Sequence, residues 1–320
     1  TITFSEAVFQ SDLLTPLTIT DLVPTIASGT ATLSSSSVST ADNTTFTFDL
    51  TLSGTSNGAE ILTLTGTVYD NVGNNTPIST GVQFNDLTSP IFSSVSPVTS
   101  SIVNTTAVGY TLSEAISSGT VVWTRTGGTA DGLSPHTKAL DGTELNTGTR
   151  ASAVLTNAPT LVSGAIYTIA FNGTDAAGNA ATEVSVTGIT FDTTAPAIAE
   201  VTAIATPSNY TTPSFVFSSD QAGTITSTLG FSSSNSASAA NNTITFTTLG
   251  EGTYTGNTVT VTDAAGNATT LTIPDFEIDT TAPALSEVTA IATPSNTTTP
   301  SYVFSSDQAG TITSTLGFSS

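Results

Sequence analysis

The sequence contains no cysteine, so disulfide bonds cannot staple its fold. Three residues are basic and 24 are acidic, which gives a formal net charge of −21 at pH 7. Phosphate groups are bound by Lys and Arg side chains, so this balance argues against nucleic acid or an anionic membrane as a partner. It favours cations as ligands. Histidine occurs once, at His136, and thiols are missing, so zinc is excluded as a metal bound at each repeat.

Long apolar segments and charged side chains are scarce as well. No run of 18 apolar residues occurs, so we predict no membrane-inserted segment. Charged residues make up 8% of the chain, against about 25% in an average soluble domain. Thr, Ser and Asn supply most of the polarity, and they favour strands and turns over helices. With Lys138 as the single lysine, Lys–Asn isopeptide cross-links are excluded as a general stabiliser.

What the sequence does contain is a repeated phrase, an aspartate four residues before a proline. It occurs at Asp86–Pro90, Asp192–Pro196 and Asp279–Pro283. The three prolines are 106 and 87 residues apart, and a segment of about 90 to 100 residues can fold alone. We therefore predict modules at residues 1–89, 90–195, 196–282 and 283–320. The same spacing leads us to expect that the first lacks its beginning and the last its end.

Two further acidic positions recur at near-constant distances from the prolines. One carboxylate follows each proline by 24 residues, at Glu114, Asp220 and Asp307. A loop of the form Asp-x-x-Gly-Asn, whose aspartate is Asp70, Asp175 or Asp263, precedes the next linker aspartate by 16 or 17 residues. Any one of these residues is explained as a turn former, because Asp bonds backbone amides and Gly adopts positive φ. Their joint recurrence in a chain that avoids charge makes them a candidate set of ligands.

Alternation of apolar and polar residues predicts the fold class. In the third module it covers 214–218, 224–229, 243–247, 258–262 and 270–273, with an edge strand near Val201 and an extended tail at 276–279. A period of two predicts strands with one buried face. About seven short strands per module predict an all-β fold of tandem immunoglobulin-like antiparallel β-sandwich modules in a linear array.

Three aromatic residues support the sandwich. Tyr167 and Tyr254 each follow a strand-initiating Gly segment and fit the tyrosine corner of such sandwiches. Trp123 lies 33 residues after its proline, and the equivalent positions of the next modules are Leu229 and Leu316. A position that accepts both Trp and Leu is most simply a core position, so we predict that Trp123 is buried.

The chain resembles the bacterial immunoglobulin-like tandem repeats of giant surface and biofilm-associated adhesins. The resemblance rests on Asp-Thr-Thr-Ala-Pro at the joints, Asp-Ala-Ala-Gly-Asn in the penultimate loop, and Phe/Leu-Ser-Glu or Ser-Ser-Asp near the second strand. The first module departs most, since its joint is Asp-Leu-Thr-Ser-Pro. The resemblance implies an extracellular, cell-surface location and joints stiffened by calcium.

Bound Ca²⁺ at the joints is the cofactor that we predict, because Ca²⁺ takes six to eight oxygen ligands in irregular geometry. In a sandwich the last strand runs away from the Asp-x-x-Gly-Asn loop. The loop aspartate is therefore expected to meet the linker of the preceding module or another loop of its own pole. The proposed ligands are Asp192, Asp279, Asp86, Asp175, Asp263, Asp70, Glu114 and Asp220.

The second module is 19 residues longer than the third and contains every basic residue and the histidine. The plain interpretation is a longer loop whose charges pair with Asp131, Asp141 or Glu144. The alternative is a contact surface for an acidic partner or a neighbouring chain, formed by Arg125, Lys138 and Arg150.

These features favour a structural role over catalysis. A Ser/His/Asp triad would need His136, which has no nucleophile elbow nearby, and no phosphate-binding glycine loop occurs. The leading hypothesis is a non-enzymatic extracellular stalk of a bacterial surface adhesin, whose partners are the neighbouring modules. The alternative is a self-assembling filament, sheath or surface-layer subunit, in which modules contact other copies of the chain. Strand edges with few lysines modestly favour assembly.

Overall fold

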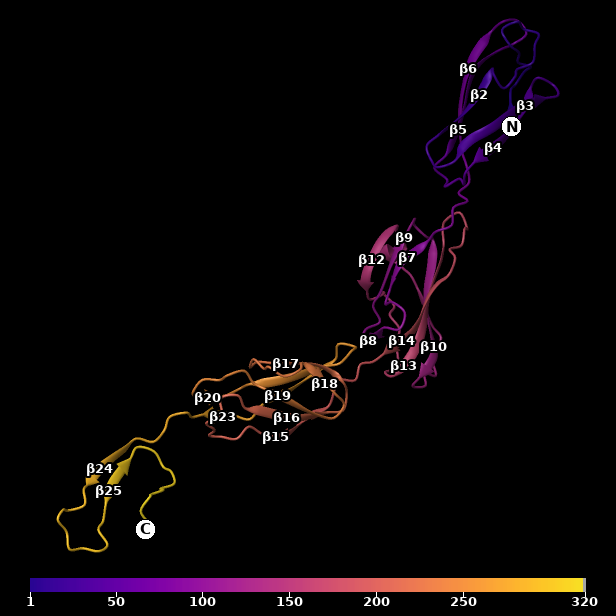
Figure 1. The fold of residues 1–320 in the computed structure, drawn as a ribbon. Helices are drawn as coiled ribbons and strands as arrows, with labels where there is room; N and C mark the ends of the chain where they lie inside the picture. The colour runs from indigo at the N-terminus through magenta and orange to yellow at the C-terminus, as the bar shows by residue number, and fades with distance from the viewer. Residues whose placement is uncertain (319–320) are drawn as a thin grey trace. The chain divides into compact units, whose positions relative to one another are not determined.

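The computed structural model describes residues 1–318, with the side chains of residues 79 and 80 outside the description. The described residues form β-strands, one short 3₁₀ helix and no α-helix, which confirms the predicted all-β class (Figure 1). No helix among them is long and apolar enough to cross a membrane. The chain divides into two compact units, Thr1–Thr193 and a second unit that begins at Thr194, and each is described by itself.

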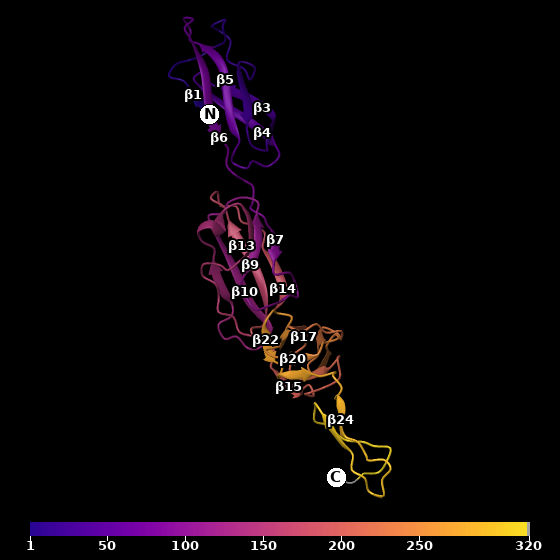
Figure 2. The same cartoon turned by 90° about the vertical axis from the view of Figure 1, so that its left-hand side faces the viewer.

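The first unit begins with two three-stranded antiparallel sheets (Figure 2). One has the order β1-β4-β3, formed by Ile2–Thr3, Thr45–Ser53 and Thr32–Thr40. The other has the order β2-β5-β6, formed by Leu22–Ala27, Ile61–Tyr69 and Asn75–Gln83. Leu22, Phe46 and Val68 are buried in one hydrophobic cluster. Because these residues come from both sheets, the cluster is the core of a sandwich.

The same unit continues with a larger sandwich. Its five-stranded sheet has the order β11-β10-β13-β14-β8, formed by His136–Ala139, Ser118–Gly128, Ala165–Thr174, Val184–Phe191 and Ile102–Val103. Its three-stranded sheet has the order β12-β9-β7, formed by Gly148–Ala153, Val108–Leu112 and Phe92–Ser96. The pair β14–β8 is parallel and the other pairs are antiparallel. Trp123 is 1% exposed in the core between the sheets, as predicted.

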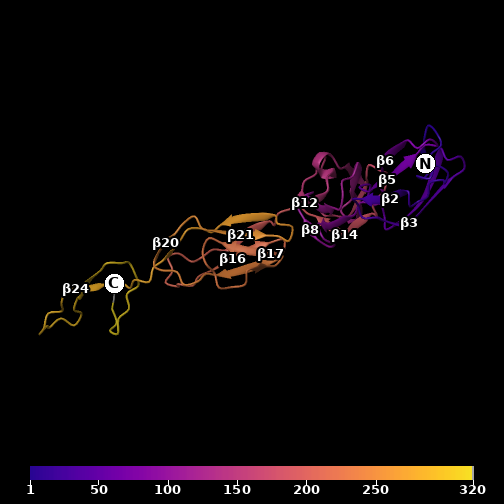
Figure 3. The ribbon, with the colours of Figure 1, turned by 90° about the horizontal axis from the view of Figure 1, so that it is seen from above.

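The second unit contains the strands that the sequence predicts for the third module (Figure 3). Sheets β15-β16-β19 and β18-β17-β21-β22 enclose a core that includes Phe215, Phe217 and Phe246, and β20 pairs with β23. In chain order, the bounds of β15 to β23 are Ile198–Thr202, Ser214–Ser219, Gly223–Ser227, Ser236–Ala237, Asn241–Thr245, Gly252–Tyr254, Thr258–Thr262, Ala268–Thr272 and Phe276–Ile278. Strands β18 and β20 were not predicted, because they are two and three residues long and too short to show alternation. Leu285–Thr289 (β24) and Val303–Ser306 (β25) form a further antiparallel pair.

The two tyrosines make the backbone contacts expected of tyrosine corners. The Tyr254 hydroxyl donates to the Gly250 oxygen at 2.9 Å, four residues upstream. The Tyr167 hydroxyl accepts a hydrogen bond from the Val162 N–H at 3.1 Å. The buried residues of the three hydrophobic clusters lie within residues 8–68, 92–191 and 204–278. The predicted module limits and the linear array stay predictions.

Candidate metal site in the first unit

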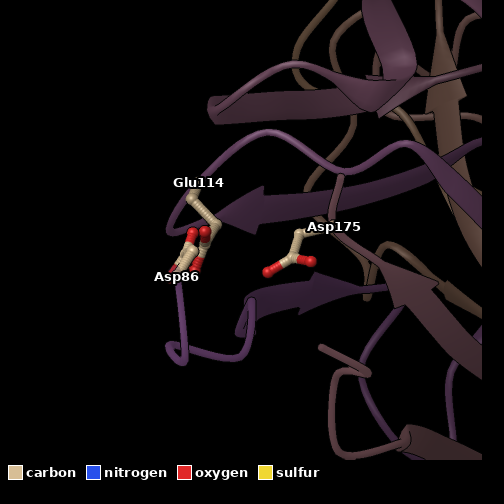
Figure 4. A group of neighbouring side chains, drawn as sticks. All are labelled: Asp86, Glu114 and Asp175. Atoms are coloured by element: carbon tan, nitrogen blue, oxygen red, sulfur yellow. The ribbon is translucent and has the colours of Figure 1, made fainter. Parts of the chain in front are cut away.

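Three of the eight predicted ligands meet in the first unit. Carboxylate oxygens of Asp86, Glu114 and Asp175 lie within 4.8 Å of one another (Figure 4). Asp86 belongs to the linker that follows β6, Glu114 follows β9, and Asp175 follows β13. Side chains 89 positions apart in the sequence thus converge on one spot. The expectation that a loop aspartate meets the preceding linker is correct here.

The linker residue Asp86 is fixed by contacts with the first sandwich. Asp86 pairs with Asn57 in an isolated antiparallel bridge. The next residue, Leu87, donates its N–H to the Ser56 oxygen at 2.9 Å, and the Thr88 hydroxyl donates to the same oxygen at 3.1 Å. One oxygen of the Asp86 carboxylate accepts the Thr88 N–H at 2.9 Å. Residues 86–88 are therefore held against residues 56–57 of the first sandwich.

The loop residue Asp175 is held by its own turn. Asn179 donates its N–H to Oδ1 of Asp175 at 2.9 Å and its side-chain NH₂ to Oδ2 at 2.8 Å. The same NH₂ group lies 3.1 Å from the Asp86 backbone oxygen and donates to it. Gly178 has φ +96°, the positive φ that the sequence assigns to this position. Asn179 thus joins the loop of the second sandwich to the linker of the first.

Repulsion by the two neighbouring carboxylates contributes to the pKa shift of Glu114. Burial and the nearby charges of Asp86 and Asp175 raise the pKa of Glu114. Burial also acts to raise the pKa of Asp175, but hydrogen bonds from Asn179 and the loop backbone outweigh it and lower that pKa. The described residues that line the open hollow around the group include no Lys, Arg or His. Negative charge therefore accumulates here without a protein cation to balance it.

The donor set fits a hard divalent cation. All three side chains offer oxygen atoms, the ligands that Ca²⁺ prefers, and the group contains neither sulfur nor imidazole. Three carboxylates supply fewer than the six to eight oxygens of a Ca²⁺ shell, so backbone oxygens or water must complete it. The hollow is open to solvent, which gives water access.

The other five predicted ligands have separate local partners. Asp70 and Asp263 make the same turn as Asp175, because each accepts the N–H and the side-chain NH₂ of the asparagine four residues later. Asp220 accepts the Ala197 N–H at 2.7 Å, and Asp279 accepts the Thr281 N–H at 3.0 Å. Asp192 accepts from the Ser163 hydroxyl at 3.2 Å. Among the described residues, Asp86, Glu114 and Asp175 form the group that can hold a metal, and ligand roles for the other five stay predictions.

The expected pairing of the longer module's charges with Asp131, Asp141 or Glu144 is wrong for the two arginines and confirmed for His136. Arg125 donates to the backbone oxygens of Thr129 and Gly128, and Arg150 to those of Thr143 and Asn146, and not to the expected carboxylates. Asp131, one of the expected partners, pairs with His136, whose Nε2 lies 2.6 Å from Oδ2. Lys138 lies on β11, an edge strand of the five-stranded sheet. The partner-contact role of Arg125, Lys138 and Arg150 stays a prediction.

Sequence reasoning missed one carboxylate near the site. Glu60 is completely buried, and both of its oxygens accept hydrogen bonds from the protein. It does not belong to any repeated motif, so the spacing that identified the other acidic residues could not find it. Its one signal is a lone acidic residue directly before the alternating segment 61–69.

Comparison with known proteins identifies the class of domain. Residues 205–280 match the family model described as a bacterial Ig-like domain. This match covers under a quarter of the chain and coincides with the sandwich core of the second unit. Domains of this family are typically structural and non-enzymatic. The sequence matches none of the curated proteins with which it was compared. The family match confirms the predicted resemblance to a bacterial immunoglobulin-like domain for residues 205–280, and the resemblance to the tandem repeats of giant adhesins stays a prediction.

Proposed function

We propose that the chain is a non-enzymatic repeat region of a bacterial cell-surface adhesin and serves as an extracellular stalk. In this proposal the linker after the first sandwich is stiffened by Ca²⁺ bound to Asp86, Glu114 and Asp175. The observation that carries it is the convergence of a linker carboxylate with two carboxylates of the following sandwich. The Ig-like family match and the separate hydrophobic clusters support a structural role.

The mechanical effect of the cation follows from the charges. Without it, three carboxylates within 4.8 Å repel one another across the joint between Asp86 and the second sandwich. A divalent cation reverses the sign of that interaction and ties the linker to the loops that carry Glu114 and Asp175. Pro90 adds stiffness of its own, because proline fixes its φ and restricts the residue before it. In this proposal, Ca²⁺ therefore replaces repulsion between the linker and the second sandwich with a bridge between them.

Calorimetric titration of the full chain with Ca²⁺ tests the site. Asp175→Asn removes a ligand charge and should weaken binding on the order of tenfold, since affinity follows the number of charged ligands. Asp70→Asn is the matched control, because Asp70 makes the same hydrogen bonds in the same turn but lies outside the group. Equal binding by both variants, or no Ca²⁺ binding by the unmodified chain, contradicts the calcium joint.

A second candidate function, a filament, sheath or surface-layer subunit, is favoured by one face of the second unit. Seven threonines and one alanine face the same way on β17, β21 and β22: Thr224, Thr226, Thr258, Thr260, Thr262, Thr270, Thr272 and Ala268. The inward residues between them, such as Ile225, Val259 and Val261, are buried. The outward face is uncharged and regular, so it lacks the charges that keep sheets apart.

Sedimentation velocity over a wide range of protein concentration separates the two functions. A stalk stays monomeric with its threonine face solvated, whereas a filament subunit associates. Replacing Thr226 and Thr260 with Lys puts charge at the centre of this face. Loss of association in that double variant would support the filament, and a monomer at every concentration would reject it.

A further inference from the structure

Glu60 is a buried carboxylate of the first sandwich, and both of its oxygens are hydrogen-bonded. Its side chain is inaccessible to solvent. Oε1 accepts the N–H groups of Thr30 and Ala31 at 2.7 and 2.8 Å. Oε2 accepts the Ser56 hydroxyl at 2.8 Å and the Asn57 N–H at 3.0 Å. A buried carboxylate is costly unless it is hydrogen-bonded, and this one joins two loops that are separated in sequence.

The loop that Glu60 holds is the one on which the linker lies. The Ser56 oxygen accepts hydrogen bonds from Leu87 and Thr88, and Asn57 forms the bridge with Asp86. Ser56 carries the connection through its hydroxyl, which donates to Glu60, and its backbone oxygen, which accepts from the linker. Asn57, whose N–H donates to Glu60, lies opposite Asp86 in the bridge. The path from Glu60 to Asp86 passes through a single residue.

Gly29 gives independent support for a site built around this carboxylate. A Cβ atom at position 29 would overlap the Glu60 carboxyl group, and the backbone there has φ +72°. Ser28, the residue before it, also has a positive φ of 65°. The loop thus adopts a conformation unfavourable for most residues and omits a side chain where the carboxylate lies.

We propose that Glu60 is a positioning residue of the joint: through Ser56 and Asn57 it fixes the backbone of residues 86–88 and so sets the place of the Asp86 carboxylate. The effect on the linker depends on the hydrogen bonds alone. The consequence for Ca²⁺ rests on the proposed function. The low pKa of Glu60, about 2, agrees with a carboxylate that remains charged.

Amide hydrogen exchange of the metal-free chain tests the effect on the linker. Glu60→Gln keeps the size of the side chain and can keep the bonds to Thr30 and Ala31, but its NH₂ group faces the Asn57 N–H. We expect the Leu87 N–H, which does not contact Glu60, to exchange on the order of tenfold faster. Ser56→Ala removes the hydroxyl contact and leaves the Ser56 oxygen in place, so a smaller acceleration is expected.

Asp42→Asn is the matched control. Asp42 accepts the N–H groups of Thr44 and Thr45 at 2.9 and 2.8 Å, at the other end of the β3–β4 hairpin. General destabilisation of the sandwich would accelerate Leu87 in this variant too, whereas the proposal predicts no change. Unchanged Leu87 exchange in folded Glu60→Gln overturns the proposal. Should Glu60→Gln fail to fold, unchanged exchange in Ser56→Ala overturns it instead.

Ca²⁺ titration of the same variants addresses the consequence for the site. Glu60→Gln should bind Ca²⁺ several-fold more weakly although Glu60 is not among the ligands, and Asp42→Asn should bind normally. If the unmodified chain binds no Ca²⁺, the calcium joint is wrong and the Leu87 result still decides the role of Glu60. If Glu60→Gln accelerates Leu87 but binds Ca²⁺ with unchanged affinity, the claim that Glu60 places Asp86 for the cation is wrong.

Discussion

The side-chain NH₂ of Asn179 donates to the backbone oxygen of Asp86 at 3.1 Å, across 93 positions of sequence. Asn179 also holds both oxygens of Asp175. One asparagine therefore sets the loop carboxylate and touches the linker that carries its neighbour. The last residue of the Asp-x-x-Gly-Asn motif thus has two roles here: it closes its own turn, and it bonds the linker of the preceding sandwich.

Replacing Glu114 with Gln should stabilise the metal-free chain and reduce the stabilisation that Ca²⁺ provides. Because the pKa of Glu114 is raised in the folded protein, the metal-free chain gains stability as pH falls from above that pKa toward 4.5, the ordinary value. Glu114→Gln removes the repelled charge, so it should raise the melting temperature in chelator at pH 7 and weaken the stabilisation by Ca²⁺. Thermal melts with chelator and with Ca²⁺ measure both effects. A melting temperature that falls equally in both conditions would contradict the electrostatic account.

Asp131 should stabilise the β10–β11 hairpin above acidic pH. Hydrogen bonds from His136 and then Tyr167 lower the pKa of Asp131 to about 2, from 3.8. The stabilisation is therefore complete above pH 3.8 and is lost as pH falls through about 2. Asp131→Asn should speed hydrogen exchange in β11 at pH 7. Glu183→Gln, which affects a carboxylate bonded to Asn172, should leave β11 unchanged, and equal effects from both would refute the prediction.

Replacing Trp123 tests whether the hydrophobic clusters unfold independently of one another. Trp123→Ala removes a fully buried side chain and should lower the free energy of unfolding of residues 92–191 by about 3–5 kcal/mol. The cluster within residues 204–278 shares no residue with it and should keep its stability. Segment-resolved hydrogen exchange in denaturant measures the two separately. Coupled loss of both clusters would show that the predicted modules are not independent.

Gly29 should tolerate a side chain less well than a glycine with similar backbone geometry. Gly256 has φ +66° and no atom near the place of a Cβ, so Gly256→Ala reports the backbone cost alone, about 1 kcal/mol. Gly29→Ala adds a clash with the Glu60 carboxyl group and should cost clearly more. Denaturant unfolding of the two variants makes the comparison. Equal costs would mean that the loop moves away from Glu60 without difficulty.

Periodic features of this protein could be predicted from its sequence. Alternation located β16, β17 and β21 because a strand with one buried face repeats every two residues. The burial of Trp123 followed from equivalent positions in other modules. The meeting of Asp175 with Asp86 followed from the direction in which the last strand of a sandwich runs.

Features that depend on a single three-dimensional contact could not be predicted. Glu60 occurs once, and its four hydrogen bonds come from loops around residues 30 and 56 whose approach no sequence spacing encodes. The turning of Arg125 toward backbone oxygens depends on loop geometry in the same way.

The most direct test of the account measures the joint between the first two sandwiches. Because the chain has no cysteine, Thr47→Cys and Thr126→Cys introduce two unique sites for spin labels on exposed strand positions of the two sandwiches. Pulsed electron spin resonance gives the distribution of distances between them. A calcium-bridged joint should give a broad distribution in chelator that narrows when Ca²⁺ is added. The same narrowing is expected in Asp70→Asn, whereas the distribution should stay broad in Asp175→Asn. A distribution of the same width with and without Ca²⁺ would contradict the account.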